Sequence, residues 1–257
     1  MLRYRFLFEQ MFRRELRRKY AGSALGVLWY VVNPLVLMGA YTLMFGLLFP
    51  QNIPDYSIFL MVGLIVWTFF QQSLMSAAPS LLDQSSLVRK ARFPRETIPG
   101  AVVTVQLVTF VAVLLLLLPV AIGVRGKAGA SLLLLPVLVA LLFAFVLGCS
   151  LVVAILHAYF RDVAPVVGAA LLPGFFISPI FFEPGQVPFV QRHGWVGTLI
   201  EWVNPVAPFI EALRRVVYDG AGPGLGRLGY AVAAAALALG AGWFAFRRGD
   251  GELAVVV

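Results

Sequence analysis

The chain has 257 residues, a mass of 28.1 kDa and a mean hydropathy of +0.91. Apolar residues make up 61% of it and charged residues 12%, whereas a soluble domain has roughly 45–50% and about 25%. This balance excludes a soluble globular enzyme, a disordered tail and a disulfide scaffold, and it predicts an integral membrane protein. The net charge of +8 is better explained by membrane topology than by binding to nucleic acid.

Residues 1–22 predict an amphipathic helix that lies along the membrane surface. Large apolar residues recur at every fourth position from Phe8, and arginines fill the opposite face. One interpretation is an anchor that holds anionic lipids. The sharper interpretation is that its cations, with the small-residue turn that follows, also meet the anionic head group of a substrate. The residues that we assign to this second role are Arg17, Arg18, Lys19, Leu25 and Gly26.

Residues 23–257 are predicted to form one membrane domain. A transmembrane helix needs about 20 mostly apolar residues. Six stretches qualify, and they cover residues 25–49, 58–78, 98–124, 130–159, 163–182 and 228–246. Pro165, Pro173 and Pro179 interrupt the fifth stretch, so we expect a kinked or re-entrant segment there instead of one straight helix.

The loop at residues 83–97, between the second and third stretches, is short, basic and amphipathic. A helix in this loop would end at its proline. Such a surface helix can dock a soluble partner, and the alternative is a loop whose charge only sets the topology. The candidate docking residues are Leu87, Arg89, Arg92, Phe93 and Pro94.

The segment at residues 183–227 is too apolar for a solvated loop. We expect two short helices that dip into the outer leaflet, separated by a break at Asn204-Pro205. The charged side chains of these helices are expected on their wet faces. They are Glu201, Glu211, Arg214 and Arg215.

The distribution of positive charge predicts the orientation. Fourteen of the 20 Lys and Arg residues fall on the side of the two termini and six on the other. By the positive-inside rule both termini are cytoplasmic. The segment before the first stretch and the segment after the last are therefore expected in the cytoplasm.

The sequence carries no pattern for catalysis or for ATP hydrolysis. It has no Gly-rich phosphate loop ending in Gly-Lys-Ser/Thr, no metal-ligand spacing, and no acidic residue in the middle of a predicted span. We therefore expect a chain that is not an enzyme and holds no cofactor. If it pumps, the energy comes from another polypeptide.

Several motifs carry a resemblance to a known family. Residues 15–35 contain Lys-Tyr, Leu-Gly, Leu-Trp and Asn-Pro-Leu elements, and residues 87–96 end in Phe-Pro-Arg-Glu. Arg161-Asp162-Val163, the Phe-Ile-Ser-Pro-Ile run at residues 176–180 and Asn204-Pro205 follow in order. Together they resemble the membrane subunits of polysaccharide ABC exporters, most closely the O-antigen type. Teichoic-acid exporters share most of this pattern, and capsule exporters resemble it less well.

The resemblance implies an all-α integral membrane protein with six transmembrane helices, an N-terminal interface helix and two short external gate helices within residues 183–218. It also implies a homodimer in the bacterial inner membrane, paired with two copies of a separate ATPase subunit that binds ATP and Mg. Residues 87–94 would be the coupling helix, and the substrate a glycan linked to undecaprenyl pyrophosphate. Rival interpretations are a membrane-embedded lipid-linked sugar transferase and a drug- or lipid-exporting relative.

Aromatic residues near the span ends are candidates for lining a path for sugars, because aromatic rings match the apolar C–H faces of sugar rings. The alternative is that these rings face lipid or pack between helices. The best candidates are Tyr30, Tyr41, Phe175 and Phe181, and the wider set adds Trp29, Phe69, Phe70, Phe176 and Phe182.

Overall fold

The structure is a computed structural model that describes residues 5–20, 28–44, 53–90, 93–127 and 129–256. Within these ranges the regular secondary structure is entirely helical. The helices are α1 (Arg5–Tyr20), α2 (Trp29–Thr42), α3 (Tyr56–Ala77), α4 (Ser80–Asp83), α5 (Ser85–Lys90), α6 (Thr97–Arg125), η4 (Ala130–Leu134), α7 (Leu135–Tyr159), α8 (Val163–Ile177), η5 (Pro184–Gln186), α9 (Pro188–Arg192), α10 (Gly194–Thr198), η6 (Leu199–Val203), α11 (Ala207–Val217) and α12 (Leu225–Val256).

Four helical segments are long and apolar enough to cross a membrane: α3, α6, η4 with α7, and α12. The prolines of α8 produce a shorter helix than the sequence suggested. Pro165 lies in the first turn, where proline is tolerated, and Pro173 lies inside the helix. Pro179 lies in the turn after the helix has ended at Ile177. With 15 residues α8 is about 22 Å long, and α2 has 14 described residues. The fifth expected span is therefore shorter here than predicted, whereas residues 25–27 and 45–49 of the first lie outside the described residues.

Helix α3 is the centre of the bundle. In the most apolar stretch of α3, 78% is buried inside the protein. The corresponding buried shares are 28% in α6, 33% in the η4–α7 segment and 17% in α12. A run of stacked rings crosses from α3 to α11, with Phe70 lying 5.9 Å from Phe145 and Phe145 lying 5.0 Å from Phe209 between ring centroids. The outer helices thus surround α3 and present their remaining apolar faces outward, as expected in lipid.

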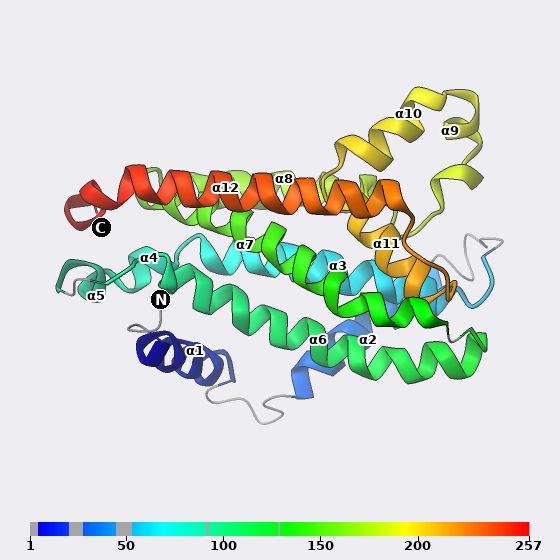
Figure 1. Ribbon diagram of the computed structural model, residues 1–257, viewed down its shortest axis with the longest axis horizontal. Coiled ribbons are helices and arrows are strands. Elements are labelled where there is room, and N and C mark those ends of the chain that lie inside the picture. The colour runs from blue at the N-terminus through cyan, green and yellow to red at the C-terminus, as the bar shows by residue number, and fades with distance from the viewer. Residues whose placement is uncertain (1–4, 21–27, 45–52, 91–92, 128, 257) are drawn as a thin grey trace.

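The two ends of the bundle differ in what they carry. Helices α1, α4 and α5 and the last turns of α12 gather at one end, and α9, α10 and α11 at the other (Figure 1). We refer to these as the α1 end and the α11 end. At the α1 end a separate apolar cluster joins Met11 of α1, Val88 of α5, Ile155 of α7 and Leu253 of α12. The segment predicted as a docking loop is therefore packed onto the ends of the long helices.

Helices α7 and α12 approach each other at their backbones. A Cβ atom added at Gly148 would lie 2.2 Å from the carbonyl carbon of Ala238, and one added at Gly242 would lie 2.7 Å from the carbonyl oxygen of Gly148. Small residues permit this contact, which is a common way for helices to associate in membranes.

The α7–α12 contact gives a prediction about stability. Gly148→Ala should destabilise the protein by about 1–3 kcal/mol, because the added methyl group forces two backbones apart. Gly240→Ala is the matched control, since nothing lies within 4 Å of a Cβ at that position in α12. Thermal unfolding of the purified protein in one detergent measures both. Equal unfolding temperatures for the two variants would contradict the prediction.

Candidate functional site

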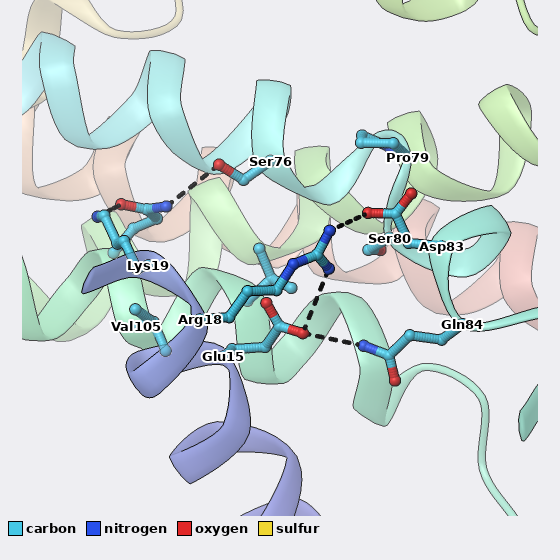
Figure 2. Close-up of a pocket in the computed structure, with 11 residues that line it drawn as sticks. Glu15, Arg18, Lys19, Ser76, Pro79, Ser80, Asp83, Gln84 and Val105 are labelled. Atoms are coloured by element: carbon cyan, nitrogen blue, oxygen red, sulfur yellow. Dashed lines mark hydrogen bonds and ion pairs between the residues drawn. The ribbon is translucent and has the colours of Figure 1, made fainter. Parts of the chain in front are cut away.

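A polar pocket of about 320 Å³ opens at the α1 end, between α1, the end of α3, α4 and α6 (Figure 2). The last turn of α1 brings Glu15, Arg18 and Lys19 to one wall of it. Asp83 and Gln84 follow the break at the end of α3, so they meet α1 from the opposite wall. The pocket therefore joins segments that are far apart in the sequence.

Arg18 bridges the two walls. Its Nη2 donates to Oδ2 of Asp83 at 3.1 Å, and its Nη1 lies 4.0 Å from Oε1 of Glu15. The same Glu15 oxygen accepts a hydrogen bond of 3.2 Å from Nε2 of Gln84. Gln84 is buried, and among the described residues its Oε1 has no partner. Because the side chains of Arg18 and Asp83 remain 57% and 40% exposed, their ion pair contributes at most about 1 kcal/mol and exchanges readily.

Lys19 reaches from the interface helix to a buried amide. Its Nζ donates to Oε1 of Gln106 at 2.5 Å, and Nε2 of Gln106 donates to Oγ of Ser76 at 3.2 Å. Gln106 lies nine residues, about 14 Å, along α6 from Thr97, so the ammonium group is drawn well away from the end of that helix. Desolvation there lowers the pKa of Lys19 from 10.5 to about 8.

The pocket contains only part of the cationic set that the sequence indicated. Arg18 and Lys19 line it, Arg17 is exposed and is not among its lining residues, and Leu25 and Gly26 lie outside the described residues. Sequence reasoning missed Gln84 and Gln106. The signal for Gln106 was available, because it is the one amide in the predicted span at residues 98–124 and such a group needs a partner in hydrocarbon.

Three of the predicted path aromatics meet in one cluster, which we call the aromatic corner: Tyr41 of α2, Phe175 of α8 and Phe181 of the turn after it. Their ring centroids lie 5.0 to 5.8 Å apart, mostly in edge-to-face or tilted geometry. Phe176 is 54% exposed and lies 5.3 Å from Phe175. The aromatic corner is therefore exposed on the side where Phe176 lies.

The other predicted aromatics are distributed differently. Phe69 and Phe70 are 3% and 8% exposed and pack against Phe110 and Phe145 within the chain. Trp29 is exposed, Phe182 is half-buried, and the side chain of Tyr30 lies outside the described residues. Whether any of these rings touches a glycan stays a prediction.

The non-helical turn beside the aromatic corner is held by side chains from three directions. Oη of Tyr56 donates to the carbonyl of Phe181 at 2.9 Å, and Nη2 of Arg214 donates to that of Ile180 at 3.3 Å. Nδ2 of Asn204 donates to Oγ of Ser178 at 2.8 Å. Backbone groups without partners are costly in hydrocarbon, and these bonds satisfy carbonyl groups of the irregular segment.

The break at Asn204-Pro205 has a local cause. Oδ1 of Asn204 accepts a hydrogen bond from the backbone N–H of Val206 at 3.1 Å, which ends η6 and leaves α11 to begin at Ala207. One expectation for this region was wrong. Arg214 was placed on a wet face, yet it is 6% exposed, because α11 is enclosed by α3, α7 and α12.

In its described part the predicted docking loop contains the short helix α5, which ends at Lys90. Leu87 and Phe93 pack against the apolar cluster at the α1 end, whereas Arg89 is exposed. The carbonyl of Pro94 accepts hydrogen bonds from the backbone N–H and the Oγ1 of Thr97, which starts α6. Arg92 lies outside the described residues. The segment thus exposes Arg89 on its outer side and packs Leu87 and Phe93 against the helices beneath it.

The fold and the pocket define a polytopic helical membrane protein with an interface helix docked against one end of its bundle. The model of the ABC-2 type transporter family matches residues 7–218, and the chain belongs to that family. It shares 30% identity over 219 residues with the O-antigen export system permease protein RfbA of Myxococcus xanthus, which covers 85% of this chain and 83% of that protein.

Two further relatives are similar over comparable lengths. An O-antigen export system permease protein RfbA of Klebsiella pneumoniae is 26% identical over 208 residues, covering 80% of this chain and 78% of the relative. The polysialic acid transport protein KpsM of Escherichia coli is 27% identical over 219 residues, covering 82% and 81%. The family match confirms the resemblance found in the motifs.

The environment of Lys19 gives a testable prediction. Lys90 and Lys127 are the other two lysines of the chain, so replacing both with arginine leaves Lys19 alone. After ¹³C-dimethylation, the NMR signal of Lys19 should titrate with a midpoint near pH 8 in the folded protein. The same chain denatured in detergent and urea is the control and should titrate near 10.5.

The lowered pKa also fixes the sign of a pH effect. Between about pH 8 and 10.5 the unfolded chain holds a proton that the folded chain has released, so docking of α1 becomes more favourable as the pH rises through this window. A midpoint above pH 10 in the folded protein would show that the ammonium group is not desolvated.

Proposed function

We propose that this chain is the permease subunit of an ATP-driven exporter that moves an O-antigen polysaccharide, linked to undecaprenyl pyrophosphate, across the bacterial inner membrane. The observation that carries the proposal is the similarity to an O-antigen export permease over 85% of the chain. In this proposal the subunit is a homodimer of six-span chains with cytoplasmic termini. Two copies of a separate ABC ATPase supply the energy, and the chain itself performs no chemistry.

The polar pocket at the α1 end is suited to the pyrophosphate of the carrier lipid. An arriving diphosphate can replace Asp83 at the Arg18 guanidinium, because that ion pair is largely exposed. Arginine binds phosphate oxygens in a bidentate manner, and Lys19 adds a second charge nearby. Bringing an anion to Lys19 also favours its protonated form. The interface helix would then select the lipid before the glycan enters the path.

Helix α5 is the proposed contact with the ATPase. Val88 of α5 is completely buried in the cluster that also holds Ile155 of α7 and Leu253 of α12. In this proposal a displacement of α5 by the ATPase therefore moves α7 and α12 directly. Arg89 stays on the exposed side, where a partner can reach it. The external helices α9 to α11 would form the gate region on the opposite side.

Capsular polysaccharide export is the second candidate function. It is favoured by the relatives named as polysialic acid transport proteins, which match this chain at 26–27% identity. The relatives named for O-antigen export include the more similar protein, at 30%. We therefore rank O-antigen export first.

Reconstitution tests the proposed function. The chain should be co-purified with its ABC ATPase in proteoliposomes, and ATP hydrolysis measured with undecaprenyl-pyrophosphate-linked O-antigen or with lipid-linked polysialic acid. We expect stimulation by the O-antigen substrate and little by the other. Stimulation by polysialic acid alone would favour the capsule alternative, and stimulation by neither would reject both.

Lys19→Glu should lower the apparent affinity for that substrate by about tenfold or more, since a hydrogen bond to a charged group contributes about 1.5–3 kcal/mol. Arg14→Glu is the matched control, because Arg14 is exposed on the same helix and does not line the pocket. Equal losses in the two variants would leave only the membrane-anchoring role for α1.

The aromatic corner gives a separate prediction. Tyr41→Ala should slow glycan export about two- to tenfold, because an aromatic contact is worth about 0.5–1.5 kcal/mol, while the partner ATPase stays active. Tyr41→Phe keeps the ring beside Phe175 and Phe181 and should export at nearly the normal rate. Export rates in spheroplasts measure both. Normal export by Tyr41→Ala would remove this residue from the path.

A further inference from the structure

A second polar pocket, of about 470 Å³, lies at the α11 end of the bundle. Its lining comes from α11, from the start of α12, from the end of α6 and from the segment that follows α8. The charged residues in it are Arg125, Arg214, Arg215, Arg227, Glu183, Glu211 and Asp219.

Two of the arginines are already paired. Nη1 of Arg125 lies 2.9 Å from Oδ2 of Asp55, and its guanidinium also stacks 3.9 Å from the ring centroid of Tyr218. Arg227 of α12 forms an ion pair with Glu211 of α11. These contacts close the walls of the pocket and leave little positive charge free for a ligand.

Arg214, in contrast, is buried and forms no ion pair with a described carboxylate. It is 6% exposed, its guanidinium lies 3.6 Å from the ring centroid of Phe59, and Nη2 donates to a backbone carbonyl. Its Nε is buried and has no partner among the described residues. Gly63 makes room for this arrangement, because a Cβ there would lie 3.0 Å from Nη2.

Arg215, the next residue of α11, lines the same pocket and is partly exposed. In the part of the chain that the structure describes, no carboxylate oxygen lies within 4.0 Å of the guanidinium of either Arg214 or Arg215. Glu183 and Asp219 are exposed, so they lie where water solvates them. Glu211, Glu183 and Asp219 therefore act on Arg214 only from beyond contact distance, and an anion that enters the pocket would supply the contact partner that this buried cation lacks.

We propose that this pocket is a binding site for an anionic group of the phosphate or carboxylate class, held by Arg214 and Arg215. A guanidinium group offers planar N–H pairs that donate to such oxygens in bidentate fashion, and both arginines line this pocket. In the topology proposed above, the site faces the outside of the cell. The site itself does not depend on which polysaccharide is exported.

Binding of inorganic pyrophosphate to the purified full-length protein in nanodiscs tests the site. The background variant Arg18→Gln/Lys19→Gln removes the cation pair at the α1 end, so any remaining binding reports on the α11 end. By isothermal titration calorimetry we expect binding in this background, an affinity loss of about tenfold or more on Arg215→Gln, and a smaller loss on Arg215→Lys.

Arg192→Gln is the matched control, since Arg192 is an exposed residue of α9 outside the pocket, and it should bind pyrophosphate normally. The test replaces Arg215 and not Arg214, because replacing the buried Arg214 could prevent the protein from folding. Absence of binding in the background variant, or equal affinity with and without Arg215, would overturn the proposal. Neither result bears on stimulation of the ATPase by O-antigen.

Competition then identifies the source of the anion. Undecaprenyl pyrophosphate included in the nanodisc should displace soluble pyrophosphate if the site receives a lipid head group. Glucuronate should displace it if the site receives an acidic sugar. Either result supports the anion site and assigns its ligand, while displacement by neutral glucose would contradict it.

Discussion

The protein has to satisfy its polar groups from within, because hydrocarbon offers no hydrogen-bonding partner. This requirement accounts for the main features at both ends. At the α1 end the buried amide of Gln106 is met by Lys19 on one side and Ser76 on the other. At the α11 end the carbonyls of Ile180 and Phe181 are met by Arg214 and Tyr56. In each case a residue distant in sequence is drawn in, and a polar pocket forms beside it.

Much of the architecture follows from local patterns in the sequence. The fourfold spacing of apolar residues from Phe8 predicts α1, and the long apolar runs predict α3, α6, α7 and α12. The tendency of Asn-Pro to interrupt a helix predicts the break between η6 and α11, which the structure contains. Each of these features depends on residues close together in the chain. The six-span count remains a prediction, since four helices reach spanning length in the described residues.

The contacts that build the two pockets could not be predicted in the same way. Lys19 and Gln106 are 87 residues apart, and nothing near either one indicates the other. Arg214 was misplaced because the amphipathic pattern of α11 shows which residues share a face but not whether water or a neighbouring helix covers that face. Here α3 covers it, and Gly63 supplies the space that the guanidinium fills. The backbone contact at Gly148 likewise depends on which helix becomes its neighbour.

The geometry of α12 has a mechanical consequence. The helix has 32 residues and is about 48 Å long. Near its start Arg227 is tied to Glu211 of α11, and near its end Leu253 is sealed into the cluster that contains Val88 of α5. The tightest contact, Ala238 to Gly242 against Gly148, falls close to its midpoint. Because α12 is one continuous helix packed along α7, it links the cluster around α5 directly to α11, and a displacement applied at α5 would meet no intervening loop that could absorb it.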